Sequence, residues 1–255
     1  MVIVITGASS GIGEALCLHY AMRGNTICLL AQNLTALENV AERCRAQGAT
    51  AFVYGADVKD APAMQRASEA IIHEAGVPDI VIANAGIRIE DPASYVGSNA
   101  AYEIMMVNYI GVINTFATFI EPMKKNGKGH LCAISSIAAY RATPNSGIYS
   151  ASKAAVNLWT EALRLKLVPH HIHVTTAASG FVRTAMTADL SFHMPGILSA
   201  AQAAAIISKA IADKKSRIMF PWQSRFIWSM FCAMPGWLYD GVILCAKKYW
   251  PSRND

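Results

Sequence analysis

Short apolar runs rich in β-branched residues alternate with longer helical patterns over most of this 255-residue chain. Six runs are predicted as strands: Val2–Thr6, Thr26–Ala31, Thr50–Gly55, Ile80–Ala83, Gly129–Ser135 and His171–Ala177. Helical patterns lie between them, at Gly11–Met22, Leu34–Ala46, Ala61–Ala75, Ala100–Lys124 and Gly147–Leu167. Strands that alternate with helices form βαβ units with right-handed crossovers. The alternation therefore predicts an α/β fold, a doubly wound parallel sheet with helices on both faces.

The composition agrees with a sheet whose strands are covered on both sides. Apolar residues make up 53% of the chain and charged residues 15%, and strands of such sheets read as unbroken apolar runs. The net charge of +5 comes from scattered Lys and Arg, so no nucleic-acid partner is expected. Six cysteines without a CxxC pair indicate reduced core residues of a cytoplasmic protein. We expect neither a signal peptide before Val2 nor a membrane-spanning helix.

The first predicted strand runs directly into a glycine-rich turn that opens the first helix. The turn reads Thr6-Gly7-Ala8-Ser9-Ser10-Gly11-Ile12-Gly13, a looser glycine spacing than the common dinucleotide fingerprint. Glycines let a backbone approach a pyrophosphate, and a helix N-terminus offers free N–H groups and partial positive charge. The turn predicts a cofactor-binding site made by Gly7, Ser9, Ser10, Gly11, Ile12 and Gly13. A strand-to-helix turn without a ligand is the alternative.

This turn resembles that of the short-chain dehydrogenase/reductase family, and other fragments follow in the family's order as far as about Thr187. Asp57-Val58 follows the third strand, where family members contact the adenine ring, and Asn84-Ala85-Gly86 follows the fourth strand, at a turn that borders the cofactor. These fragments fall at the carboxyl ends of strands, where open α/β sheets bind ligands. The resemblance implies a Rossmann-like oxidoreductase that uses NAD(P) on a small carbonyl or alcohol substrate, without a metal and as a homo-oligomer.

Tyr149 and Lys153 lie four residues apart on a predicted helix, so their side chains share one face. A neighbouring ammonium lowers the pKa of a phenol from about 10, which suits proton exchange with a carbonyl or alcohol oxygen. Exposed helices also carry such pairs without chemistry. The resemblance adds Ser136, preferred over Ser135, as the hydrogen-bonding partner of the substrate oxygen. It adds Asn108 as the residue that helps hold a proton-relaying water, with a satisfied polar residue in a buried helix as the alternative.

The resemblance also gives Lys153 a second task, a hydrogen bond to the nicotinamide ribose. Tyr149, Lys153, Ser136 and Asn108 therefore form the predicted catalytic set. In reduction, Tyr149 would protonate the carbonyl oxygen while Ser136 stabilises the developing charge.

The segment after the sixth strand departs from the family pattern. Ser179 stands where the family has a proline before Gly180, so the loop loses a fixed φ angle. Gly180, Val182 and Thr184 are still expected to contact the cofactor near its nicotinamide. His193 lies in the following region, which covers the substrate in family members, and is a candidate substrate contact.

The end of the second strand bears on the choice between the two nicotinamide cofactors. It reads Ala31-Gln32-Asn33, without the acidic residue that binds the ribose hydroxyls in NAD enzymes. Gln32, the expected cofactor contact, stands where NADP enzymes often have arginine. Because the missing carboxylate removes repulsion against a 2′-phosphate, NADP is favoured over NAD.

Three histidines, His170, His171 and His173, gather near the start of the sixth strand. Their spacing alternates between strand faces, and no acidic or cysteine residue is adjacent. We expect surface or turn residues rather than a metal site.

The chain changes character after a helical stretch at Ser199–Ala212 and a last predicted strand at Arg217–Phe220. Residues 221–255 carry four of the five tryptophans. We divide the chain into a dinucleotide-binding and catalytic part, 1–220, and an aromatic-rich C-terminal extension of the same domain, 221–255. Three roles remain open for the extension: a subunit interface, a lid over a lipophilic substrate, or an amphipathic surface on the inner face of a membrane, with Lys247 and Lys248 at its edge.

These observations predict an NAD(P)-dependent oxidoreductase. One alternative is a catalytically silent cofactor-binding regulator or scaffold, which would have no need for the whole catalytic set. Another is a nucleotide-sugar epimerase or dehydratase, whose chains are usually longer and use the tighter glycine spacing.

Overall fold

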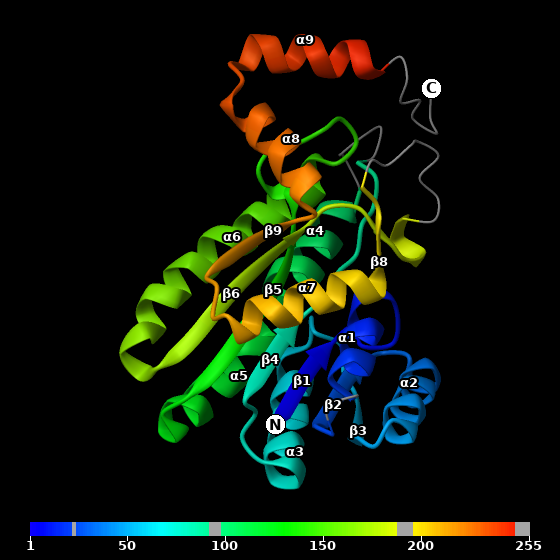
Figure 1. The fold of residues 1–255 in the computed structure, drawn as a ribbon, viewed down its shortest axis with the longest axis vertical. Coiled ribbons are helices and arrows are strands. Elements are labelled where there is room, and N and C mark those ends of the chain that lie inside the picture. The colour runs from blue at the N-terminus through cyan, green and yellow to red at the C-terminus, as the bar shows by residue number, and fades with distance from the viewer. Residues whose placement is uncertain (22–23, 92–97, 188–195, 248–255) are drawn as a thin grey trace.

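A computed structural model describes residues 1–21, 24–91, 98–187 and 196–247. A parallel seven-stranded sheet, in the order β3-β2-β1-β4-β5-β6-β9, forms its centre (Figure 1). The strands are β1 (Val2–Thr6), β2 (Thr26–Ala31), β3 (Thr50–Gly55), β4 (Ile80–Ala83), β5 (Gly129–Ser136), β6 (Ile172–Ser179) and β9 (Arg217–Phe220). The strand order reverses between β1 and β4, so the chain winds outward from the centre in both directions. The predicted doubly wound, Rossmann-like sheet is confirmed.

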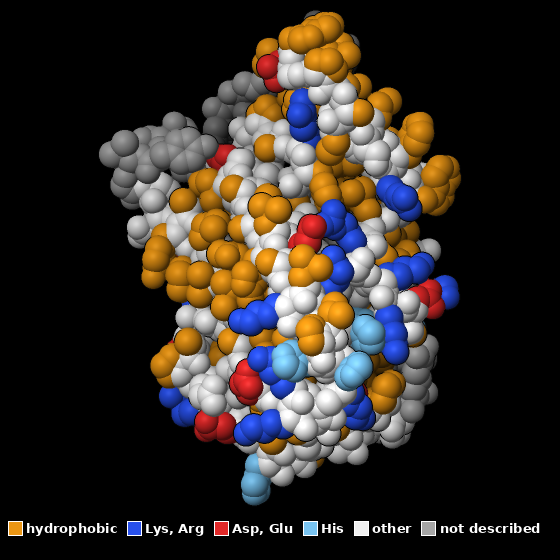
Figure 2. All heavy atoms as spheres, turned by 90° about the vertical axis from the view of Figure 1, so that its left-hand side faces the viewer, with side chains coloured by type: hydrophobic (Ala, Val, Ile, Leu, Met, Phe, Trp, Pro, Cys, Tyr) orange, Lys and Arg blue, Asp and Glu red, His pale blue; other side chains and the backbone are white. Residues whose placement is uncertain are grey.

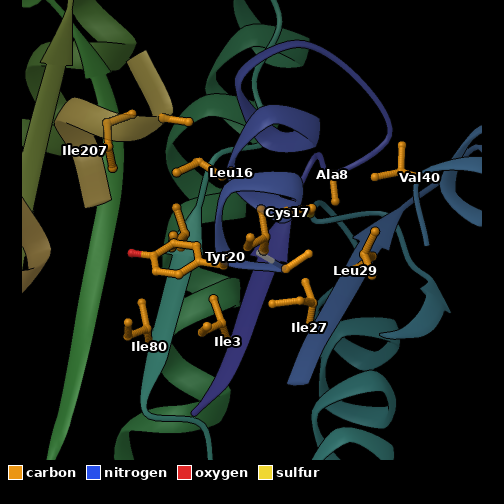
Figure 3. Close-up of a cluster of buried hydrophobic side chains, with 14 of the residues drawn as sticks. Ile3, Ala8, Leu16, Cys17, Tyr20, Ile27, Leu29, Val40, Ile80 and Ile207 are labelled. Atoms are coloured by element: carbon orange, nitrogen blue, oxygen red, sulfur yellow. The ribbon is translucent and has the colours of Figure 1, made fainter. Parts of the chain in front are cut away.

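Helices cover both faces of the sheet. One layer contains α1 (Gly11–Ala21), α2 (Leu34–Ala46) and α7 (Ala200–Ala212); the other contains α3 (Ala61–Ala75), α4 (Ala100–Met105), α5 (Gly111–Asn126) and α6 (Gly147–Leu167). Alternate residues of β1 face opposite layers, since successive strand side chains point to opposite sides. Ile3 packs with Leu16 and Tyr20 of α1, in the cluster that also holds Ile207 of α7 (Figure 3), whereas Val4 belongs to the other core. Each face of the sheet therefore has its own apolar core.

The predicted helix at Ala100–Lys124 proves to be α4 and α5 joined by a π turn, Met106–Ile110. Among the described residues, the run Ala100–Asn126 is the one helix with the length and apolarity of a membrane span. Phe116, Phe119 and Met123 of this run are fully buried in the core cluster on the sheet. Its apolarity is therefore that of a core helix.

The C-terminal extension adds two helices, α8 (Trp222–Ala233) and α9 (Gly236–Lys247), beyond the carboxyl end of β9 (Figure 1). The Tyr239 hydroxyl of α9 donates a hydrogen bond to the Ala142 carbonyl at 2.6 Å. The Arg141 guanidinium lies 4.1 Å from the centre of the Tyr239 ring, a cation–π distance. The extension is thus anchored to the loop between β5 and α6.

The cysteines divide between the core and the extension. Cys17, Cys28, Cys44 and Cys132 are buried and free, as predicted. Burial raises the pKa of the Cys132 thiol to about 12, which keeps it protonated and unreactive. Cys232 and Cys245 are exposed, so the expectation of core cysteines is wrong for these two, because the helices that carry them lie outside the sheet layers.

Candidate active site

A cleft of about 430 Å³ opens at the carboxyl ends of β1 to β4, where the strand order reverses. It is lined by most of the residues predicted to bind the cofactor: Gly7, Ser9, Ser10, Gly11, Ile12, Gln32, Asp57, Val58, Asn84, Ala85, Gly86, Tyr149, Lys153 and Thr184. Gly13, Gly180 and Val182 are absent from this lining. Elements far apart in the sequence therefore converge on one cleft, with the glycine turn in its wall and the Tyr149–Lys153 pair also lining it.

The glycine turn is held by its backbone and by the residue that ends β4. Gly7 and Gly11 have φ angles of +62° and +58°, which glycine adopts without strain. A Cβ on Gly13 would lie 2.2 Å from the Gly7 carbonyl oxygen. The Asn84 side chain donates hydrogen bonds to the carbonyls of Thr6 and Gly7 at 3.0 and 3.2 Å. Because Gly13 has no side chain, the start of α1 packs directly against the backbone at Gly7. Most of the other residues of the turn line the cleft.

At the end of β2, the cleft wall consists of Ala31, Gln32 and Asn33, which are all uncharged. The Asn33 side chain caps α2 by accepting a hydrogen bond from the Ala36 amide at 3.0 Å. The carboxylate in the cleft lining is Asp57, and Lys59 lies 3.8 Å from it. This end of the cleft therefore carries no unpaired negative charge among its described residues.

At the other end, Tyr149 and Lys153 of α6 meet Ser136 at the end of β5. Ser136 and Tyr149 line the same cavity, and the Ser136 side chain is near enough to the phenol to lower its pKa. The Lys153 ammonium is buried, donates to the Ile134 carbonyl at 3.0 Å, and lies 6.0 Å from the centre of the Tyr149 ring. The structure therefore brings these three predicted residues together. Ser136 lies near the Tyr149 phenol, and the Lys153 ammonium lies beside the Tyr149 ring.

The pKa values of this pair differ from the expectation that Lys153 lowers the pKa of the phenol. Burial raises the pKa of Tyr149, opposed in part by the nearby Ser136 side chain and by the charge of Arg88. Burial lowers the pKa of Lys153 to about 8. The physical reason is that the ammonium bonds to a backbone carbonyl instead of the phenol, so desolvation dominates for both groups. In the free protein Tyr149 is a neutral phenol at neutral pH, able to donate a proton.

Asn108 lies in the π turn and is fully buried. Its Oδ1 accepts a hydrogen bond from the Ile87 amide at 2.8 Å, and its Nδ2 donates to the Ile87 carbonyl and the Ser152 hydroxyl at 2.9 and 3.1 Å. The alternative of a satisfied polar residue therefore describes most of its bonding. One lone pair of Oδ1 remains, and a Cβ on Gly86 would lie 3.2 Å from this atom and 3.4 Å from the Lys153 Nζ. The absence of a side chain at Gly86 leaves room beside both groups.

Ser135 and Ser179 line the cleft, and their hydroxyls bond to backbone carbonyls. The Ser135 hydroxyl donates to the Lys153 carbonyl at 3.4 Å, and the Ser179 hydroxyl donates to the Ser135 carbonyl at 3.3 Å. The residue that replaces the family proline thus bonds β6 to β5 at the floor of the site.

A second cavity of about 140 Å³ adjoins the cleft, and Tyr149 lines both. Apolar side chains form much of its wall: Ile12, Ile137, Ala138, Phe181, Val182, Met186 and Trp228. Ser136 and Arg88 also line it, as do Gly180 and Val182, two of the predicted cofactor contacts that the cleft itself lacks. Arg88 and the individual contribution of Trp228 were missed by sequence reasoning, because neither lies at a motif position. The lid hypothesis for the extension was the one signal that pointed to Trp228.

The histidine cluster lies at the opposite edge of the sheet. His170 and His171 are exposed in the turn before β6, and His173 lies beside His130, with ring centres 5.8 Å apart. Across the described ranges, no three His, Cys, Asp or Glu side chains gather as a metal site. His193 and Lys248 lie outside the described residues, as does the Lys247 side chain.

Comparison with known proteins identifies the class. A family model described as short chain dehydrogenase matches residues 1–194, and the chain belongs to this family. An uncharacterized oxidoreductase of Myxococcus xanthus is 32% identical over 239 residues, which is 94% of each chain. The protein is accordingly an oxidoreductase of the short-chain type, and its family binds NAD(P).

Two solved structures share the fold. A 3-ketoacyl-ACP reductase from Sinorhizobium meliloti is 28% identical, with a TM-score of 0.79 over 86% of this chain and 97% of that chain. An alcohol dehydrogenase from Thermococcus sibiricus, complexed with 5-hydroxy-NADP, is 26% identical, with a TM-score of 0.77 over 86% and 95%. The predicted family and enzyme class are therefore confirmed.

Proposed function

We propose that the protein reduces a small lipophilic carbonyl compound, or oxidises the corresponding alcohol, with Tyr149 as the group that exchanges the proton. The observation that carries this proposal is the position of Tyr149, which lines both the cleft and the apolar pocket. The reductase and the alcohol dehydrogenase that share the fold act at the same kinds of functional group.

The residues that line the cleft suit successive parts of a nicotinamide dinucleotide. The glycine turn suits the pyrophosphate, since it combines backbone N–H groups with a helix N-terminus. Asp57 and Val58 suit the adenine end, and the open space at Gly86 beside Lys153 suits the ribose nearest the reaction. When bound, the nicotinamide supplies or accepts the hydride.

The protein's own part in the reaction is proton transfer and charge stabilisation. In reduction, the Tyr149 hydroxyl donates its proton to the carbonyl oxygen, and the Ser136 hydroxyl, in the lining of the same pocket, holds that oxygen. The Lys153 ammonium stabilises the phenolate that remains. The Asn108 Oδ1 has one free lone pair for a water that returns the proton. In oxidation the same groups act in reverse.

A Tyr149→Phe variant tests this role in a panel of ketones, aldehydes and alcohols with both cofactors. We expect kcat to fall by about two to four orders of magnitude, while dinucleotide binding, measured by calorimetry, stays within about threefold, because the ring is retained. Tyr140→Phe is the matched control, since the Tyr140 hydroxyl has no hydrogen-bond partner among the described residues and Tyr140 is in the lining of neither cavity. Unchanged turnover in Tyr149→Phe would overturn the proposal.

We also propose NADP as the preferred cofactor over NAD, supported by the uncharged wall at Ala31, Gln32 and Asn33. A carboxylate placed there would repel the 2′-phosphate. Gln32→Asp should therefore weaken NADPH binding by about tenfold or more and leave NADH binding nearly unchanged, with Gln32→Asn as the control. Equal effects on the two cofactors would contradict the preference.

For the extension, residues 221–255, we propose a role as the outer wall of the substrate pocket within the same domain. Trp228 supports this role because it lines the pocket with Ser136 and Tyr149. The exposed aromatic side chains of the extension suit contact with a second copy of the chain in a homo-oligomer or with an anionic membrane surface. We also propose that the protein is cytoplasmic. A regulator without turnover is not favoured, because Tyr149, Ser136 and Lys153 are assembled.

A further inference from the structure

Arg88 places a charge in the wall of the apolar substrate pocket. It lies two residues after Gly86 and lines the cavity together with Ser136 and Tyr149. The other residues of that lining are apolar or carry neutral hydroxyl groups. Within the described lining, the guanidinium is therefore the one fixed charge that a substrate meets.

No carboxylate of the protein neutralises this charge among the described residues. Arg88 is half-buried, and none of the ion pairs in the described ranges includes it. Asp91, three residues along, is bonded instead to α6: its carboxylate accepts hydrogen bonds from the Gly147 and Ile148 amides at 2.7 and 3.2 Å. An unpaired guanidinium at the edge of an apolar cavity favours an anionic ligand, because it offers a planar set of N–H donors that matches a carboxylate.

The charge acts close to the reacting oxygen. Arg88 is among the groups that lower the pKa of Tyr149 against the effect of burial. The two residues line one cavity of about 140 Å³, which suits a ligand whose anionic group lies a few bonds from the carbonyl at Tyr149. The apolar residues Ile137, Phe181 and Trp228 are left to contact the remainder of the ligand.

We propose that Arg88 binds a carboxylate of the substrate, and that the substrates are oxo acids and hydroxy acids. Their carboxylate lies a few bonds from the reacting carbon, and the rest of the molecule is apolar. This inference rests on the proposed function, because it assigns the substrate class of the same pocket.

Matched substrates separate the charge from the rest of the molecule. We would compare β-hydroxyoctanoate with its methyl ester in initial-rate oxidation by the full-length protein. Arg88→Leu should lower kcat/KM for the acid by about tenfold to hundredfold, chiefly through KM, since a hydrogen bond to a charged group is lost. The ester should lose less, since only the effect of Arg88 on the pKa of Tyr149 is shared by both substrates. Arg88→Lys retains the positive charge but lacks the planar set of N–H donors, so it should recover part of the loss.

Arg225→Leu is the control, because Arg225 is an exposed arginine of α8 outside the pocket lining. It should leave the preference for the acid intact. If Arg88→Leu lowered kcat/KM equally for acid and ester, or left kcat/KM for the acid unchanged, the role of Arg88 would be overturned.

Binding measurements make the result independent of turnover. Calorimetry on Tyr149→Phe, with the dinucleotide present, should show that the acid binds and that adding Arg88→Leu weakens this binding. Equal affinity in both backgrounds would overturn the inference even if the protein turned over neither probe. Turnover of neutral ketones together with indifference to Arg88 would sink this inference alone. Undiminished turnover in Tyr149→Phe would instead sink the proposed function.

Discussion

The two cavities that meet at Tyr149 are built in different ways. The dinucleotide cleft is formed by strand ends and tight turns of the central sheet, with Asn84 bonded to the backbone of the glycine turn. The substrate pocket is formed by side chains from separate segments, among them Arg88 after β4, Ser136 at the end of β5 and Trp228 of α8. The first can change little without disturbing the fold, whereas the second can change its specificity one side chain at a time.

The largest expected effect on stability comes from one methyl group in the first region. In Gly13→Ala, the new Cβ would lie 2.2 Å from the Gly7 carbonyl oxygen, so the turn must move. We expect a loss of stability of about 1–3 kcal/mol and a dinucleotide affinity weakened by at least about tenfold. Chemical denaturation and calorimetry would measure the two effects.

The same substitution in the extension should have the opposite sign. Gly241 lies inside α9, and a Cβ there would meet nothing within 4 Å. Gly241→Ala should therefore stabilise the protein by up to about 1 kcal/mol through its higher helix propensity, without changing dinucleotide binding. If both glycines tolerated alanine equally well, the contrast between the two regions would not hold.

The second effect tests the extension as part of the pocket. Trp228→Ala removes an indole from the pocket wall, and we expect KM for apolar substrates to rise by about tenfold, with dinucleotide affinity unchanged. Trp237→Ala is the control, because Trp237 is 75% exposed and lies outside the lining. Equal kinetic effects of the two variants would refute a wall made by α8.

The contrast also explains what sequence reasoning could reach. The strand order, the glycine turn and the Tyr149–Lys153 pair depend on local patterns, since periodicity, turn residues and helical spacing are visible within a short window. Arg88 and Trp228 come together only through tertiary contacts, such as the bond from Tyr239 to Ala142 that anchors the extension. The pKa of Tyr149 was predicted in the wrong direction, because burial cannot be read from the spacing of two residues.

The third effect concerns the phenol at the junction of both cavities. Because the pKa of Tyr149 is raised, the proton-donating form predominates at neutral pH, whereas oxidation needs the phenolate. Between about pH 5 and pH 7, below the pKa of about 8 of Lys153, kcat/KM should stay nearly flat for reduction and rise with pH for oxidation. Initial rates in both directions measure this difference. Oxidation that slows as the pH rises in that range would contradict a phenol held neutral by burial.

The smallest effect on the site is expected from the outer side of the extension. Trp222, Phe226 and Met230 lie four residues apart along α8 and are 74%, 69% and 45% exposed. Hydrophobic side chains gather on the upper part of the molecule, where α8 and α9 lie (Figure 2). None of the three residues lines the substrate pocket. They therefore form an outward row, distinct from the inward Trp228.

Replacing this row by serine should leave kcat/KM for a small substrate within about twofold, while removing whatever contact the row makes. Sedimentation equilibrium would detect the loss of a second copy, and co-sedimentation with anionic vesicles the loss of a membrane surface. A large drop in kcat/KM would show that the row acts on the pocket itself. In that case α8 would not have an outer face that is independent of the pocket, and the whole helix would act as a lid beside the dinucleotide cleft.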